Sequence, residues 1–133
     1  MTTVETVQNI YAAFGRGDIP AILACLADDI EWEYGHFPNP VPWLQPRRGH
    51  AGAQQFFNEL AALEFLSFQP LKVFGDADTV LGLVSLEAKV RATGKHIVEA
   101  GEVHIFQFNP RGRVQRFRHA ADSWQHAMAL RGD

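Results

Sequence analysis

The sequence lacks the features that mark several large classes of protein. It has one cysteine, Cys25, so no internal disulfide can form and we expect no secreted, disulfide-stapled scaffold. No apolar run approaches the roughly 18 residues of a membrane-spanning helix, and residues 2–5 carry no sign of a signal peptide. The 12 basic and 15 acidic residues are mixed along the chain, with no basic run. We therefore expect a cytoplasmic protein that binds neither a membrane nor nucleic acid.

Short motifs for a cofactor, a metal or a nucleophile are also missing. There is no phosphate loop and no Gly-x-Ser-x-Gly elbow, and Cys25 falls in an apolar helical pattern. The six histidines, at positions 36, 50, 96, 104, 119 and 126, follow neither a His-x-His nor a His-Glu-x-x-His spacing. We expect no metal, no bound cofactor and no covalent catalysis.

The sequence does contain enough apolar material for one core. Its 133 residues are 47% hydrophobic and 20% charged, a composition typical of a globular protein. That length is normal for one domain, which we expect to span residues 1–133.

Helical spacing dominates the start of the chain. Apolar residues recur at this spacing over residues 4–14, behind a capping box formed by Thr2 and Glu5. Asp18 has the chemistry to cap a second helix, which we expect to end at residues 28–29.

A strand and a loop are predicted next. Alternation places Trp32, Tyr34 and His36 on one face of a strand. Residues 37–50 hold four prolines and Trp43, which predicts a long loop, and long loops often act as lids.

The remainder of the chain predicts one more helix, at 53–63, and then mainly strands. Asp122 or Ser123 is expected to cap a tail helix that runs to Leu130. This order of elements predicts an α+β fold whose sheet buries one face against the helices. The four predicted strands are Phe68–Phe74, Thr79–Arg91, His96–Phe108 and Arg113–Ala121.

Three stretches carry a resemblance to a known family. YAAFGRGDIPAILACLADDIEWEYGH, RRGHAGAQQFF and ATGKHIVEAGEVHIFQFNPRGRVQRFRHAADSW are similar to the opening, the third helix and the closing hairpin of nuclear transport factor 2-like proteins. The chain resembles in particular the SnoaL-like group, which includes polyketide cyclases and ketosteroid-isomerase-related proteins. This resemblance implies a cystatin-like α+β roll: a cone-shaped, strongly curved, mixed or antiparallel sheet that encloses a hydrophobic pocket together with three N-terminal helices.

The resemblance does not extend to the residues of the ketosteroid isomerases. In an alignment without gaps, the isomerase tyrosine falls on Ile10 and the base aspartate on Tyr34. Counted back from Gly112 with one added turn residue, the oxyanion-hole aspartate falls on His104. Because none of the three is kept, we expect no ketosteroid isomerase of the known mechanism.

Limonene epoxide hydrolases offer a second comparison within the resemblance. Their first catalytic aspartate falls near Glu87 and their second on Asp122, whereas their arginine falls on Ser85. Arg116 or Arg118 would have to replace that arginine.

His104 is the candidate acid or base. Alternation places it on the aromatic face of its strand, where an apolar pocket would bring its pKa near neutrality. The alternative is a structural histidine, hydrogen-bonded inside the fold. Asp122 would orient a partner or a water, unless it is only a helix cap, and Tyr34 or His36 would polarise a ligand oxygen. The other expected ligand contacts are Ile10, Phe14, Trp32, Trp43, Phe56, Phe57, Glu87, Glu102, Phe106 and Arg118.

Two functions follow as hypotheses. The first is an enzyme that isomerises, cyclises or hydrates a small, mostly apolar molecule by proton transfer without a cofactor. The second is a module that binds or senses a small ligand without chemistry. Convergence of two or more ionisable side chains inside the pocket would favour the enzyme. Val103 and Ile105 lie on the face opposite His104, so both sheet faces are apolar and a homodimer through the outer face is expected.

Overall fold

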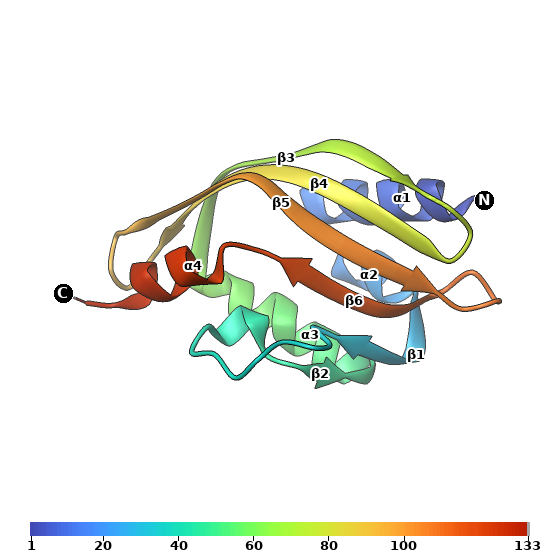
Figure 1. Cartoon of the computed structure of the whole chain (residues 1–133), viewed down its shortest axis with the longest axis horizontal. Helices are drawn as coiled ribbons and strands as arrows, with labels where there is room; N and C mark the ends of the chain where they lie inside the picture. Colours follow the sequence, from blue (N-terminus) through green and yellow to red (C-terminus); the bar gives the residue numbers. More distant parts are fainter. Residues whose placement is uncertain (133) are drawn as a thin grey trace.

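A six-stranded, strongly curved sheet holds helices against its concave side (Figure 1). The structure is a computed structural model that describes residues 1–132. Its helices are α1 (Thr3–Gly15), α2 (Ile19–Leu23), α3 (Gly49–Glu59) and α4 (Ser123–Leu130), with short 3-10 turns η1 (Pro42–Leu44) and η2 (Leu60–Ala62). Its strands are β1 (Leu26–Trp32), β2 (Arg47–Arg48), β3 (Leu63–Gly75), β4 (Thr79–Val90), β5 (His96–Phe108) and β6 (Val114–Ala120).

The sheet is mixed. Its strand order is β2-β1-β6-β5-β4-β3, and neighbouring strands are antiparallel except for the parallel pair β1–β6. This arrangement confirms the predicted α+β fold, with β2 and β3 as its two edges. Within residues 1–132, no helix has both the length and the apolar character required to cross a bilayer.

Three predicted helix starts are confirmed by their caps, whereas α3 begins at Gly49 and not at the predicted residue 53. The Glu5 backbone N–H donates to the Thr2 hydroxyl at 3.0 Å, and the Thr2 N–H donates to the Glu5 carboxylate at 2.9 Å. Asp18 accepts from the N–H of the third residue after it, and Asp122 does the same at the start of α4. These bonds satisfy amide groups that a helix start leaves without partners.

The strand predicted through His36 is too long, because β1 ends at Trp32. Glu33 adopts a left-handed backbone with φ of 59°, and Gly35 follows with φ of 76°. The chain therefore turns immediately after Trp32, and Tyr34 and His36 do not continue its strand face. Glu33 is fully buried.

Other boundaries also differ from the prediction. Residues 28–29 lie inside β1 with exposed side chains, so they do not end α2. The helix predicted to run to residue 63 ends earlier, because the 3-10 turn η2 follows α3 and Leu63 already begins β3. The predicted loop at 37–50 contains η1 and β2, which shortens its irregular part.

A β-bulge in β5 determines which carboxylates enter the core. Val84 pairs with Glu102 and Leu86 pairs with Glu99, so β5 carries one extra residue between these pairs. An extra residue reverses the alternation of side chains along a strand. As a result both Glu99 and Glu102 are buried on the concave side, although only two residues lie between them.

Candidate active site

An apolar cavity lies between the concave face of the sheet and helices α1 and α3. Its free volume is about 80 Å³, which is small beside the roughly 300–1,000 Å³ of typical ligand pockets. The sequence-predicted contacts that line it are Ile10, Phe14, Trp32, Trp43, Phe56, Phe57, Glu102, His104 and Phe106.

Ionisable side chains gather on one part of the cavity wall. Five of them line it: Tyr11, Glu102, His104, His119 and His126. They come from α1, β5, β6 and α4, so four separate elements bring them together. The rest of the lining is aliphatic or aromatic apart from the indole N–H groups.

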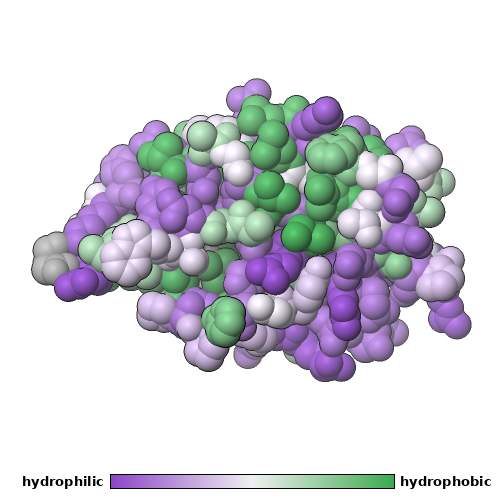
Figure 2. Space-filling view, viewed as in Figure 1, coloured by the Kyte–Doolittle hydropathy of each residue, from purple (hydrophilic) through white to green (hydrophobic). Residues whose placement is uncertain are grey.

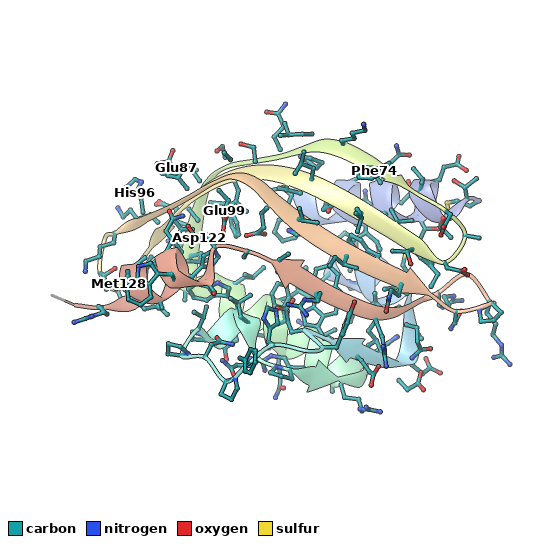
Figure 3. The ribbon with its side chains drawn as sticks, viewed as in Figure 1. Phe74, Glu87, His96, Glu99, Asp122 and Met128 are labelled. Atoms are coloured by element: carbon teal, nitrogen blue, oxygen red, sulfur yellow. The ribbon has the colours of Figure 1, made fainter. Side chains whose placement is uncertain are left out.

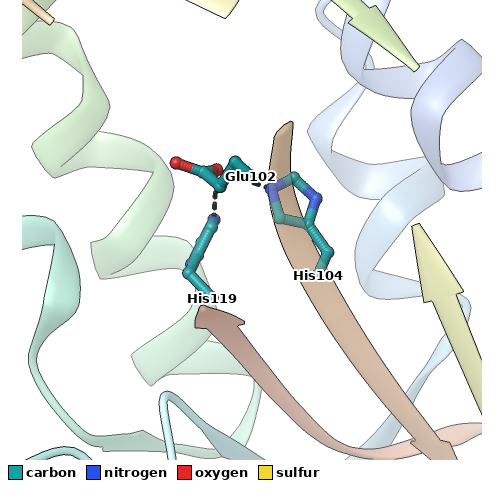
Figure 4. A group of neighbouring side chains, drawn as sticks. All are labelled: Glu102, His104 and His119. Carbon is teal, nitrogen blue, oxygen red and sulfur yellow. Dashed lines mark hydrogen bonds and ion pairs between the residues drawn. The ribbon is translucent and has the colours of Figure 1, made fainter. Parts of the chain in front are cut away.

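His104 is hydrogen-bonded at both ring nitrogens. Its Nε2 atom lies 2.7 Å from Glu102 Oε1, and its Nδ1 atom lies 2.8 Å from the Tyr11 hydroxyl. Figure 4 shows the imidazole directed at the carboxylate. An ionised carboxylate only accepts hydrogen bonds, so Nε2 carries the proton and Nδ1 accepts from the phenol. The three side chains form a directed chain of donors, Tyr11 to His104 to Glu102.

Burial and charge assign protonation states to this chain of residues. Burial lowers the pKa of His104 below its ordinary value, although the hydrogen bond to Glu102 opposes this effect. Burial would raise the pKa of Glu102, but the hydrogen bond from His104 and the nearby charge of His119 lower it. Burial, assisted by the Glu102 charge, raises the pKa of Tyr11. At neutral pH the chain is a phenol, a neutral imidazole and a carboxylate.

His119 forms a second carboxylate–imidazole pair, with Glu33, and in this pair the pKa of the imidazole is raised and not lowered. Glu33 Oε1 lies 2.5 Å from His119 Nδ1 and accepts the His119 backbone N–H at 3.0 Å. Burial would raise the pKa of Glu33, but His119 and His36 lower it to about 2. Burial would lower the pKa of His119, but the charge and hydrogen bond of Glu33 raise it above its usual value. Glu33 therefore favours the charged form of His119, whereas burial favours the neutral form of the adjacent His104 ring, and the two ring centroids are 4.7 Å apart.

A third pair joins α4 to the sheet. His126 Nε2 lies 2.8 Å from Glu99 Oε2, and the Trp43 indole N–H donates to His126 Nδ1 at 2.9 Å. Since indole only donates, Nδ1 is the acceptor and Nε2 carries the proton. His126 Nε2 also lies 3.8 Å from Glu102 Oε2, which links this pair to the first.

Glu102, His104 and His119 have donor atoms within 4.8 Å of one another, the composition of a transition-metal site. The 2.7 Å contact between His104 Nε2 and Glu102 is a hydrogen bond, and an ion would have to displace it. A second trio of Glu99, Glu102 and His126 has its imidazole Nε2 already protonated toward Glu99. We interpret both groups as parts of one network of hydrogen bonds and longer ion pairs.

Several predicted site residues lie outside the cavity lining. Tyr34 packs beneath the guanidinium groups of Arg116 and Arg118, at 5.3 and 5.7 Å from its ring centre. The turn at Glu33 moves it off the Trp32 face. His36 contacts Glu33 with Nε2 3.0 Å from Oε2, behind the cavity wall.

The two remaining carboxylates are also elsewhere. Glu87 points away from the core and pairs with His96 at 2.7 Å on the outer face, because alternation on β4 faces it outward (Figure 3). Asp122 is exposed and accepts a hydrogen bond from the Gln125 N–H as the cap of α4. This is the second of the two roles predicted for it, a helix cap.

Sequence reasoning missed Tyr11, Glu33, Glu99, His119 and His126. Tyr11 adjoins Ile10, the position that the alignment without gaps selected, so the signal was one residue away. His119 alternates with the buried Phe117 on β6, which was visible in the sequence. The bulge and the left-handed turn that bury Glu99 and Glu33 have no clear sequence signal.

Comparisons with known proteins agree with this architecture. The sequence profile of the SnoaL-like domain matches residues 7–117. The crystal structure of an NTF2-like protein from Burkholderia xenovorans LB400 is 26% identical, covers 97% of this chain and 95% of its own, and has a TM-score of 0.83. An NTF2-like protein from Burkholderia thailandensis E264 is 24% identical with 98% coverage of both chains and a TM-score of 0.82. TerC, co-crystallised with polyporic acid, is 20% identical with 96% coverage of both chains and a TM-score of 0.73. No curated protein sequence matches the chain.

Proposed function

The chain belongs to the SnoaL-like domain family, and from that premise we propose that it is an enzyme that moves a proton on a small, mostly apolar molecule bearing a carbonyl, enol or epoxide oxygen. The observation that carries this proposal is His104, which is hydrogen-bonded at both ring nitrogens on the wall of an apolar cavity. TerC, a structure of the same fold, was crystallised with a small organic molecule, which supports a ligand of that size.

In the proposed reaction, the three residues work as a relay. A ligand proton passes to the Tyr11 oxygen while the Tyr11 proton moves to His104 Nδ1. The resulting imidazolium is stabilised by Glu102 at its other nitrogen. The reverse transfer returns the proton to another ligand atom, so no cofactor is consumed. Acid–base catalysis of this kind contributes about 10²–10⁴-fold to a rate.

The apolar walls contribute by excluding water. Phe68 lies 6.1 Å from the Tyr11 ring, and Phe106 meets it edge-on at 6.0 Å. In such surroundings fixed hydrogen bonds are stronger than in water. Convergence of five ionisable groups supports the enzyme over a binding module, since a storage pocket has no need of three buried carboxylate–imidazole pairs.

Exchange of an acidic C–H proton tests the proposal without knowledge of the natural substrate. Proton NMR in D₂O would follow deuterium entry next to the carbonyl of 2-tetralone, a small apolar ketone. We expect acceleration over buffer, and a loss of about 10²-fold in the His104→Gln variant. Glu87→Gln, a carboxylate change on the outer face, should leave exchange unchanged. Exchange no faster than in buffer would reject the proposal.

We also propose that two copies pair through the outer face of the sheet. Leu66, Leu71, Phe74 and Val98 expose 45–55% of their surface there, and Figure 2 shows apolar residues gathered over β3 to β5. An apolar patch of this kind commonly marks an interface.

A further inference from the structure

His119 has a hydrogen-bond donor that nothing in the described residues 1–132 accepts. Its Nδ1 is engaged by Glu33, whereas its Nε2 makes no hydrogen bond, and the nearest carboxylate oxygen, Glu102 Oε1, is 4.0 Å away. The side chain is only 12% exposed and lines the cavity. Apart from its 4.0 Å ion pair with Glu102, this nitrogen has no partner among the described residues and keeps some exposure, so it is open to a ligand oxygen in the cavity.

Glu33, which holds His119 in place, has a strained backbone conformation. Glu33 is fully buried, accepts twice from His119, and adopts a left-handed backbone conformation that is uncommon for any residue but glycine. Such conformations persist where the surroundings over-determine them, and they concentrate at functional sites. Here the turn is what aims the Glu33 carboxylate at His119 Nδ1, and that bond in turn directs Nε2 at the cavity.

We propose that His119, held as a cation by the positioning residue Glu33, anchors an ionised ligand oxygen, so that the cavity takes acidic enols and phenols. The groups that face the His119 ring are Glu33 from the turn after β1, Glu102 and His104 from β5, and the rings of Phe56 from α3 and Phe117 from β6. An oxygen in front of Nε2 would supply the missing acceptor.

This inference rests on the proposed function, because the relay must remove the ligand proton. The ligand O–H bond breaks and its proton goes to Tyr11, whose own proton goes to His104. The ligand is left as an anion opposite the His119 imidazolium, and Glu102 balances the new charge on His104. No oxidant, metal or second reactant enters the step.

The dye 4-nitrophenol tests the anchor directly, because its phenolate and phenol forms have different absorption spectra. The titration is run at a pH where the free dye is mostly the neutral phenol, and 4-nitroanisole serves as a probe of nearly the same shape without an acidic oxygen. We expect wild-type protein to bind the dye with a phenolate spectrum and more tightly than the anisole. His119→Gln and Glu33→Gln should each lose about tenfold of that preference, the scale of one charge-assisted hydrogen bond, and should keep anisole binding.

Glu31→Gln is the matched control, because Glu31 is an exposed carboxylate on β1 that pairs with Arg48 and Arg116. It should leave the spectrum and both affinities unchanged. Equal binding of the two probes, or a phenolate spectrum that survives both His119→Gln and Glu33→Gln, would overturn the anchor and leave the relay standing. Failure of wild-type protein to bind either probe would overturn the ligand cavity and the proposed function with it.

Discussion

The hydroxyl of Tyr11 occupies the place that a side chain at Gly82 would fill. Gly82 stands opposite His104 on the β4–β5 ladder, and a Cβ built on Gly82 would lie 2.0 Å from the Tyr11 oxygen. The absence of a side chain at this one position therefore lets a phenol from α1 reach the imidazole on β5.

Gly82→Ala should break the relay without changing any of its members. Tyr11 has to move, so the Tyr11–His104 bond is lost and overpacking costs about 1–3 kcal/mol of unfolding free energy. Urea denaturation would measure the stability, and 2-tetralone exchange would measure the relay. Gly15→Ala is the control, because nothing lies within 4 Å of a Cβ there, and it should be neutral or slightly stabilising. Full exchange activity in Gly82→Ala would contradict the role of Tyr11.

Asp122→Ala should affect stability rather than chemistry. Asp122 caps α4 and is exposed, so its loss should cost about 1 kcal/mol and leave proton exchange intact. Thermal melting and the exchange assay would be measured on the same preparations. Asp28→Ala, an exposed carboxylate in β1, should change neither. A large drop in exchange with unchanged stability would restore Asp122 as a catalytic residue.

Glu33 should make stability fall in acid. Its folded pKa of about 2 lies below the ordinary 4.5, so its stabilisation is present above about pH 4.5 and is lost as the pH falls toward 2. The difference corresponds to about 3 kcal/mol. Urea midpoints across this window should fall in wild-type protein and change less in Glu33→Gln. Identical slopes in the two proteins would contradict the buried ion pair.

His119 contributes the opposite pH dependence. Its pKa is raised in the folded chain, so its stabilisation is present below the ordinary value of 6.5 and is lost as the pH rises through the folded value. The Glu33–His119 pair should therefore stabilise the fold most in the mildly acidic range, above the pH at which Glu33 is protonated and below the pH at which His119 loses its proton. The same urea series, extended to alkaline pH in wild-type protein and in His119→Gln, measures this loss of stability with rising pH.

Light scattering tests the outer face of the sheet. Wild-type protein should be a dimer at micromolar concentration, and Val98→Glu should be a monomer, because the substitution places a charge in the exposed apolar patch. Phe37→Glu, at another exposed aromatic in the loop after β1, should remain dimeric. A monomeric wild-type protein would exclude this interface.

Much of the fold was predictable because alternation and capping are local. The extent of β5, the caps at Thr2, Asp18 and Asp122, and the inward face of His104 all follow from spacings of two to four residues. The aromatic cavity lining was predictable for the same reason, since Phe56 and Phe106 repeat at the period of their element.

Most of the polar network could not be predicted in this way, because it depends on breaks in those periods. Glu99 faces inward only through the β5 bulge, and Glu33 only through a left-handed turn. Tyr34 shows the converse error, because alternation extended past Trp32 placed it in the cavity. Pairings such as Trp43 with His126 join residues 83 positions apart, which no local pattern encodes.

We expect the two neighbouring histidines to hold opposite charge states, with His104 a neutral base and His119 a cation. Nitrogen-15 NMR of the imidazole rings at neutral pH measures this directly, with assignments from His104→Gln and His119→Gln. One protonated nitrogen, Nε2, is expected for His104, and two protonated nitrogens are expected for His119. A doubly protonated His104, or a neutral His119, would contradict it.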